Sequence, residues 1–240
     1  IPAASLANLV YAPATNGNGN AYATIGFKVQ DDGGTVNGGQ DTSVNANTVT
    51  FNVTPVNDAP TGADKTITLL EDGSRTLAAA DFGFADAADT PANSLSAVII
   101  TSLPASGTLT LGGSPVTLNQ SIPAASLGSL VYTPAANGNG TGYATIGFKV
   151  VDNGGMDNGG QNTSVNANTL AFNVTAVNDA PVNTVPGAQT ASEDTAKAIA
   201  GLSVNDVDGN LATVKLTVLN GTLGVSLAGG ASVSAGANNS

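Results

Sequence analysis

The sequence predicts an all-β protein made of tandem β-sandwich domains. Two observations support this fold class. Short apolar runs, several of them with alternating apolar and polar residues, are separated by clusters of Gly, Asn, Asp and Pro. The chain also repeats itself: residues 1–60 match residues 122–181 at a constant offset of 121, with 46 of the 60 positions identical. A unit of that length has the size of one β-sandwich domain.

The offset divides the chain into three parts. Residues 1–60 are the C-terminal half of a repeat (the half-repeat), and residues 61–181 form a complete repeat. Residues 182–240 are the N-terminal half of a third, more divergent repeat, in which SEDTA and NDVDGN correspond to LEDGS and ADAADT of the complete repeat. We therefore expect the chain to be a slice of a longer tandem array.

The first strands of the complete repeat are marked by β-branched residues between turn residues. The segments KTITLL (65–70) and SAVIITS (96–102) are rich in Ile, Val and Thr, which favour strands. A short strand is expected between them at 75–79. The segment TLTL (108–111) follows a Ser-Gly turn, and a hairpin partner for it is expected at 116–118.

Three more strands complete the repeat. SLVYT (129–133) follows IPAASL, for which a single helical turn is expected. In the next strand, 144–151, Ile146 and Phe148 alternate with small or polar residues at a period of two, and the last strand, 169–177, shows the same alternation. Seven short strands in one repeat indicate an immunoglobulin-like Greek-key sandwich.

Composition excludes several classes of function. The chain has no Cys, His or Trp, so disulfides, catalytic triads that use His, and metal sites built on thiolate or imidazole cannot form. Its net charge is −11, which disfavours nucleic acid as a partner. No apolar run approaches the length of a membrane span, so no membrane insertion is expected. Oxygen ligands remain, and they suit Ca²⁺ or Mg²⁺.

The positions of the acidic residues in the sequence predict that they gather at the two ends of each domain. Successive strands of a sandwich run in opposite directions, so alternate loops gather at the same end. One junction is expected to bring together Asn57, Asp58, Asp86, Asp89 and Asp152. The next is expected to bring together Glu71, Asp72, Asn178, Asp179, Asp206 and Asp208. Because several carboxylates at one joint repel one another, we expect Ca²⁺, which takes 6–8 oxygen ligands, to fill each junction.

At these residues the chain resembles a known family. VNDAP, at 56–60 and 177–181, looks like the Asn-Asp-x-Ala-Pro linker of cadherin repeats, shortened by one residue. Glu71 resembles the glutamate that follows the first cadherin strand, and Asp152 lies where the family has an aspartate between its last two strands. The segment Asp206–Asp208 resembles the Asp-x-Asp pair of the following domain. The resemblance implies that these residues bind Ca²⁺.

The closer resemblance is to the tandem cadherin-like repeats of giant bacterial RTX-type surface adhesins. This resemblance rests on sequence segments such as ITSLPASGTLTL, LVYTPAANGNG and VNDAP and covers essentially the whole chain. It implies an extracellular protein, on the bacterial cell surface or in a secreted biofilm matrix, whose repeats form stalks stiffened by calcium. The sequence departs from the cadherin pattern where Asp86 and Asp89 are spaced more widely and where 134–142 lacks an acid. Fewer ions per junction than in cadherins are therefore expected.

Three classes of function can be compared. The first is a structural stalk or extender, whose partners are the neighbouring repeats of the same chain; near-identical duplication suits a spacer. The second is a module of the same adhesin that binds glycans or other matrix proteins, for example through exposed Tyr side chains. The third is an enzyme, for which only a two-carboxylate glycosidase is conceivable. Ten aromatic residues are too few for a lined sugar cleft, so no enzyme is expected.

Two further alternatives concern single segments. The glycine-rich segments 31–41 and 152–162 are expected to be flexible loops, although a second ion loop is the alternative. If the chain is itself a subunit, the third part could be completed by the half-repeat of a neighbour, which would give a head-to-tail fibre. The difference between the third part and residues 61–121 favours a slice of one continuous chain instead.

Overall fold

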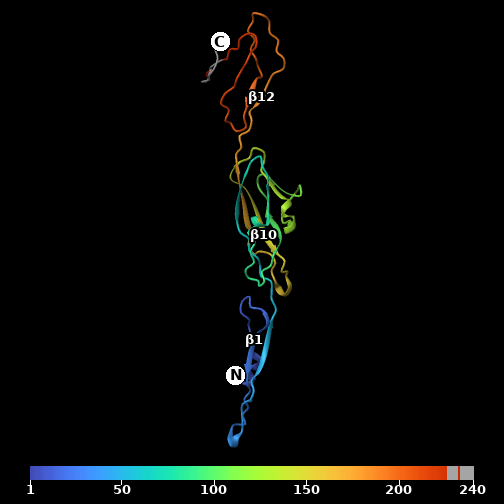
Figure 1. The fold of residues 1–240 in the computed structure, drawn as a ribbon, viewed down its shortest axis with the longest axis vertical. Helices are drawn as coiled ribbons and strands as arrows, with labels where there is room; N and C mark the ends of the chain where they lie inside the picture. The colour runs from blue at the N-terminus through green and yellow to red at the C-terminus, as the bar shows by residue number, and fades with distance from the viewer. Residues whose placement is uncertain (226–231, 233–240) are drawn as a thin grey trace. The chain divides into compact units, whose positions relative to one another are not determined.

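The structure, a computed structural model, describes residues 1–225 and residue 232 and divides the chain into two compact units, Ile1–Val177 and Asn178–Ser240 (Figure 1). Most of its regular structure is β, in several sheets that are mainly antiparallel, and its helical segments are short 3₁₀-helices. The predicted β class is thus confirmed. Within the described residues, no helix combines the length and the apolar character that crossing a membrane requires.

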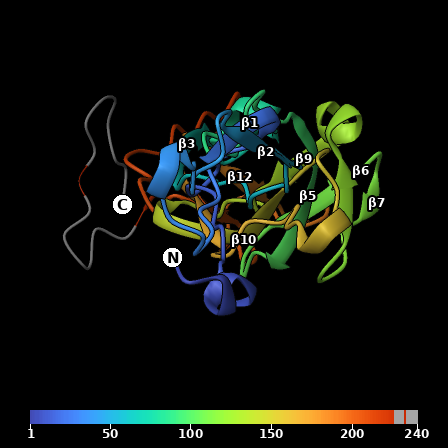
Figure 2. The same ribbon diagram turned by 90° about the horizontal axis from the view of Figure 1, so that it is seen from below.

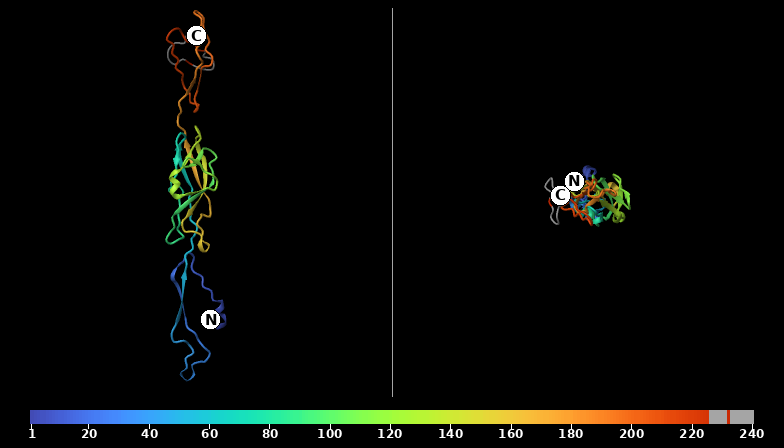
Figure 3. Two further views of the ribbon diagram at one scale, coloured as in Figure 1. Left: turned by 90° about the vertical axis from the view of Figure 1, so that its right-hand side faces the viewer. Right: turned by 90° about the horizontal axis from the view of Figure 1, so that it is seen from above.

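The half-repeat contains one two-stranded sheet. Strand β1 (Gly19–Phe27) pairs antiparallel with β2 (Asn47–Val53), as can be followed in the blue part of the ribbon in Figure 3. Two 3₁₀-helices, η1 (Ala3–Asn8) and η2 (Val36–Gly38), lie before β1 and between the strands. The loop that carries η2 includes the glycine-rich segment 31–41.

The complete repeat contains two sheets. The five-stranded sheet has the order β3-β11-β10-β5-β8, with bounds of Lys65–Leu70, Asn168–Thr175, Gly140–Asp152, Leu95–Ser102 and Ser121–Pro123. In it, β3 runs parallel to β11 and the other neighbours are antiparallel. The four-stranded sheet has the order β4-β9-β6-β7, with bounds of Arg75–Thr76, Leu130–Thr133, Thr108–Leu111 and Ser114–Pro115. The hairpin of β6 and β7 can be followed in Figure 2. The 3₁₀-helices are η3, η4 and η5, at Ala79–Asp81, Ala124–Ser129 and Asp157–Gly159.

One apolar core joins the two sheets. The inward residues of the period-two strands are fully buried, including Ile146 and Phe148 of β10. Across the core, the ring of Tyr132 from the four-stranded sheet stacks on Phe172 of β11 with ring centroids 4.0 Å apart. The Tyr132 hydroxyl donates a hydrogen bond to the Ser106 carbonyl at 3.0 Å. Burial, with a smaller contribution from Tyr143, raises the pKa of Tyr132 to about 12.

Most predicted strands are confirmed, and two details are wrong. The strand predicted at 75–79 is only Arg75–Thr76, because the chain turns into η3, where Asp81 is buried and accepts a hydrogen bond from the Ala78 N–H. The hairpin partner predicted at 116–118 lies at Ser114–Pro115, since Val116 turns into the core. The helical turn predicted over IPAASL is confirmed as η4.

The buried Asp81 also holds the first unit's two ion pairs. Lys65 Nζ lies 2.6 Å from one of its carboxylate oxygens, and Arg75 lies 3.3 Å from the other. Burial alone would raise the pKa of Asp81, but the hydrogen bonds from Lys65 and the Ala78 N–H, and the two cationic charges, bring it below its usual value. Asp81 thus links β3, β4 and η3.

The half-repeat exposes side chains that the complete repeat buries. Phe27 is 42% exposed and Leu9 54%, whereas their equivalents at the 121-residue offset, Phe148 and Leu130, are both 0% exposed. In the complete repeat both positions lie in the core cluster between the two sheets, which residues from 61–121 such as Phe82 and Ile100 help to fill. Many core positions of the complete repeat can therefore be compared with an equivalent, more exposed residue in the half-repeat.

The second unit contains a short antiparallel pair in its described part. Strand β12 (Val182–Thr184) pairs with β13 (Ser203–Asn205). The Asp-Val-Asp segment follows β13 directly, at Asp206 to Asp208. The unit thus places its linker and its acidic loop at adjoining ends of two paired strands.

Candidate metal centre

The linker Asn57-Asp58 is anchored to the glycine-rich loop 152–162, inside the first unit. The Asn57 side-chain amide donates to the Gln161 carbonyl at 2.7 Å and to Asp152 Oδ1 at 3.1 Å. In return, the Gln161 N–H donates to the Asn57 carbonyl at 2.8 Å. Asp152 also accepts from the Gly154 N–H at 2.8 Å, which fixes its carboxylate at the end of β10.

The same linker contacts the loop between η3 and β5. The Asp58 N–H donates to Asp89 Oδ2 at 3.0 Å. Asn93 bridges the cluster: its side-chain amide donates to Asp89 Oδ2 at 3.2 Å and to Asn57 Oδ1, and its backbone N–H donates to Asp86 Oδ2 at 2.7 Å. The structure thus brings together all the residues predicted for the first junction, which we call the junction cluster: Asn57, Asp58, Asp86, Asp89 and Asp152, with Asn93.

The cluster concentrates negative charge without a cationic partner. Asp152 is 2% exposed and Asp86 8% exposed, and both ion pairs of residues 1–177 go to Asp81 instead. Asp86 Oδ1 is buried and has no hydrogen-bond partner. A buried carboxylate oxygen with neither a donor nor a cation is energetically costly, and a bound cation would satisfy it.

The ligand atoms that the cluster offers are all oxygens. They come from carboxylates, Asn side chains and backbone carbonyls, and this set matches the preference of Ca²⁺ rather than that of zinc or other softer metals. Within residues 1–177, no three carboxylates place oxygens within 4.8 Å of one another. A cation at the cluster would therefore draw on amide or backbone oxygens as well as on carboxylates.

Charge crowding is visible at Asp89. Burial raises the pKa of Asp89, and the negative charges of Asp86 and Asp58 add to the increase, while hydrogen bonds from the Asp58 N–H and Asn93 oppose it. The ionised form of Asp89 therefore disfavours the folded state when no cation is bound.

This shift predicts a pH dependence in the presence of a chelator. A carboxyl with a raised pKa in the folded state contributes stability at low pH, and this contribution is lost as pH rises through the folded pKa. We expect the stability of the wild type, relative to an Asp89→Asn variant, to fall as pH rises above the ordinary aspartate value of 3.8. Urea unfolding of both proteins in EDTA between pH 3.5 and 7 measures the difference. A difference that does not change with pH would contradict the expectation.

Glu71 is held at the opposite end of the complete repeat, directly after β3. Its two carboxylate oxygens accept from the Val177 N–H at 2.7 Å and from the Asn139 side chain at 2.8 Å. The Val177 bond, and then the Asn139 bond, lower the pKa of Glu71 against the effect of burial. Glu71 is almost fully buried, whereas the next residue, Asp72, is exposed in a turn.

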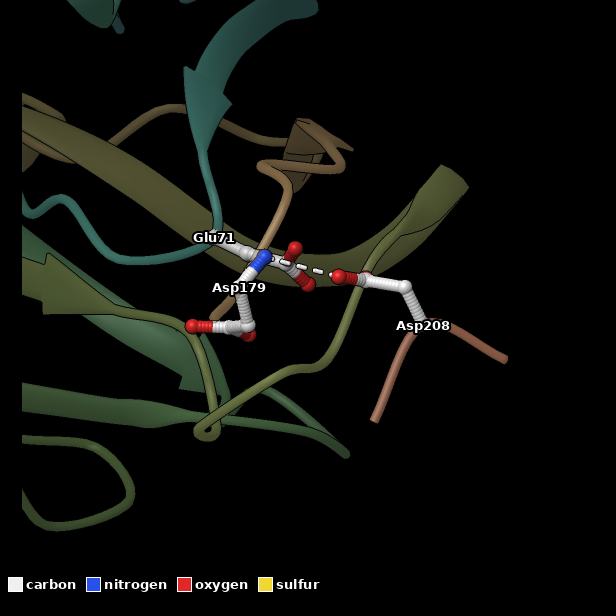
Figure 4. Close-up of side chains that lie close together, drawn as sticks. All are labelled: Glu71, Asp179 and Asp208. Atoms are coloured by element: carbon white, nitrogen blue, oxygen red, sulfur yellow. Dashed lines mark hydrogen bonds between the residues drawn. The ribbon is translucent and has the colours of Figure 1, made fainter. Parts of the chain in front are cut away.

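The second unit repeats part of the junction pattern within itself. The Asp179 N–H donates to Asp208 Oδ2 at 2.7 Å, as the Asp58 N–H does to Asp89, and Figure 4 shows this bond as a dashed line. The Asn210 side chain donates to Asn178 Oδ1 at 2.6 Å, which corresponds to the bond from Asn93 to Asn57. Asp206 accepts from the Asp208 N–H at 2.9 Å. That Glu71, also labelled in Figure 4, and Asp72 share a site with these residues stays a prediction.

Sequence reasoning missed the amide side chains of the cluster. Asn93 and Asn210 connect the linker to the acidic loop in their respective units, and Asn139 supports Glu71. A signal was present in the sequence, because Asn210 follows Asp208 by two residues and Asn93 follows Asp89 by four. The wider Asp86–Asp89 spacing leaves the role of the second acid unchanged, since Asp89 and Asp208 accept the same linker N–H.

Comparisons with models of protein families, with curated proteins and with solved structures found no match to this chain.

Proposed function

We propose that this chain is a stalk or extender segment of a secreted bacterial surface adhesin or fibre, built from tandem immunoglobulin-like, cadherin-like Greek-key sandwich repeats and stiffened by Ca²⁺ at its junctions. Two sheets around one core and a near-exact duplication support the repeat architecture. The resemblance of VNDAP and the acidic loops to cadherin-like adhesin repeats supports the adhesin context.

One observation carries the calcium part of the proposal. Asp86 lies in a cluster with three other aspartates, is 8% exposed, and keeps one carboxylate oxygen without any partner. The first unit places both of its ion pairs elsewhere, at Asp81, so the charge of the cluster is not balanced by Lys or Arg. A divalent cation would supply the missing charge and the missing ligand contact together.

The bound ion would act on the linker. Carboxylates of Asp58, Asp86, Asp89 and Asp152, not more than two of them on one ion in this geometry, would hold Ca²⁺, with the amide oxygens of Asn57 and Asn93 as further ligands. The ion would neutralise their repulsion and tie the linker to the two loops that already bond it. This link would restrict rotation between one repeat and the next, and an extended stalk requires that restriction to stay stiff.

Calcium is expected to stabilise the chain. A ligand that binds only the folded state raises the free energy of unfolding by about 2.7 kcal/mol when its free concentration is a hundred times its Kd. We expect thermal unfolding in millimolar Ca²⁺ to occur at a higher temperature than in EDTA at matched ionic strength, and small-angle scattering to report a narrower range of chain dimensions. Mg²⁺, which requires a smaller octahedral site, is the control cation. Identical melting curves and scattering in Ca²⁺ and EDTA would overturn the calcium proposal.

The alternative, a glycan-binding module, stays a prediction without a supporting observation. Of the tyrosines that could form a sugar platform, Tyr132 is fully buried and Tyr11 stacks on Phe51 at 4.2 Å. A glycan array with the full chain tests it directly.

A further inference from the structure

The glycine-rich loop 152–162 is shaped around an asparagine. The Asn57 side chain and carbonyl exchange a pair of hydrogen bonds with the backbone of Gln161, at 2.7 and 2.8 Å. Two glycines leave the space that this side chain fills: a Cβ on Gly160 would lie 3.1 Å from the Asn57 Cβ, and a Cβ on Gly154 would overlap Asn57 Oδ1. We call this arrangement the asparagine socket; it consists of Asp152, Gly154, Gly160 and Gln161.

The half-repeat contains the same socket, preformed, in its loop 31–41. At the 121-residue offset the four socket residues are identical: Asp31, Gly33, Gly39 and Gln40. The backbone conformations of loops 31–41 and 152–162 also agree. The Gly33 N–H donates to Asp31 Oδ1 at 2.9 Å, and the Gly154 N–H donates to Asp152 Oδ1 at 2.8 Å. Asn37 and Asn158, at the tips of the two loops, share a φ of 56°.

In the half-repeat, no described residue takes the place of Asn57 beside Gly33. A Cβ on Gly33 would approach only Asp31 of its own loop, at 3.2 Å, whereas the equivalent Gly154 faces Asn57. A pocket of about 360 Å³ lies next to the socket and shares Asp31 and Gln40 with it. The socket of loop 31–41 therefore keeps the polar groups that receive Asn57 in the complete repeat.

We infer that the socket of loop 31–41 binds the Asn-Asp linker of another repeat, that is, a peptide segment with the sequence Val-Asn-Asp-Ala-Pro. The required ligand is a primary amide next to a backbone carbonyl, which can pair with Gln40 and donate to Asp31, as Asn57 does with Gln161 and Asp152. An Asp in place of the Asn would set a carboxylate against Asp31, and Gln would be longer by one methylene. Repeats would thus recognise one another through the linker itself, and this recognition does not depend on calcium.

Peptide titration tests the inference on the full chain. We would add acetyl-Thr-Pro-Val-Asn-Asp-Ala-Pro-amide to the ¹⁵N-labelled protein in EDTA and follow the backbone amides. The expected result is a saturable shift of Gln40 and Gly33 at millimolar peptide. Gln161 and Gly154 should not shift, because Asn57 already occupies their socket. A peptide with Ala in place of the first Asn should bind at least tenfold more weakly.

Two chain variants supply matched controls. Asp31→Ala removes the carboxylate that accepts from the amide and should abolish the shifts. Asp32→Ala removes the same charge from the neighbouring position, which is not one of the four socket residues, and should leave them unchanged. Shifts that are absent up to 10 mM peptide, or equal for the Asn and Ala peptides, would overturn the inference. Because the titration contains EDTA, a failure here leaves the calcium proposal standing, and a failure of the calcium experiment leaves this inference standing.

Discussion

Replacing Asp86 with Asn is expected to change stability in opposite directions with and without calcium. In EDTA, the Asp86→Asn variant should be more stable than the wild type by up to about 1 kcal/mol, because a buried charge is removed from a cluster of like charges. The Asn carbonyl can still accept from the Asn93 N–H, which now bonds Asp86 Oδ2 at 2.7 Å. In calcium, the variant should lose most of the ligand-dependent stabilisation, which amounts to about 2.7 kcal/mol at a hundred times Kd.

The measurement is a set of paired melting curves in EDTA and in Ca²⁺. Asp157→Asn is the matched control, since Asp157 is an exposed carboxylate of the same unit in η5, outside the junction cluster. It should change neither curve by more than about 0.5 kcal/mol, as is usual for surface substitutions. If Asp86→Asn lowers stability equally in both conditions, Asp86 is only a hydrogen-bond acceptor for the 85–94 loop.

The strands that could be predicted are those whose residues show a local pattern. Strands β3 and β6 lie where they were predicted, and β10 and β11 follow the alternation of Ile146, Phe148 and their neighbours. Strand β8 (Ser121–Pro123) was not predicted. It is three residues long and is defined by its pairing with β5, so no local period marks it. The end of β4 likewise depends on burial of Asp81, a tertiary effect.

The junction cluster could be predicted in part because strand direction alone assigns loops to the ends of a domain. That reasoning placed Asp86, Asp89 and Asp152 together; in the structure Asp89 and Asp152 accept hydrogen bonds from the linker, and Asp86 is connected to it through Asn93. It could not identify Asn93, because nothing in the sequence says which amide turns toward the linker. Nor could it identify the socket of loop 31–41, since the socket is recognised only when the same loop is seen with and without Asn57.

Truncating Tyr132 is expected to be among the most damaging single changes in the complete repeat. Its ring is fully buried and stacks on Phe172 at 4.0 Å, so Tyr132→Ala should cost about 3–5 kcal/mol, the usual range for removing a buried aromatic ring. Tyr132→Phe keeps the ring and loses only the hydrogen bond to the Ser106 carbonyl, at a cost of about 1 kcal/mol. Native-state hydrogen exchange of the β10 and β11 amides measures both values.

The chain supplies its own control for this substitution. Tyr11 is the equivalent of Tyr132 in the half-repeat and also stacks on a phenylalanine, Phe51, with ring centroids 4.2 Å apart. It is only partly buried, because the half-repeat lacks the strands that cover this position in the complete repeat. We therefore expect Tyr11→Ala to leave the exchange of β10 and β11 unchanged and to cost about 1 kcal/mol or less within β1 and β2. Equal costs at Tyr11 and Tyr132 would mean that the half-repeat is covered in solution, and its apolar face would then have to be occupied by a segment that resembles residues 61–121.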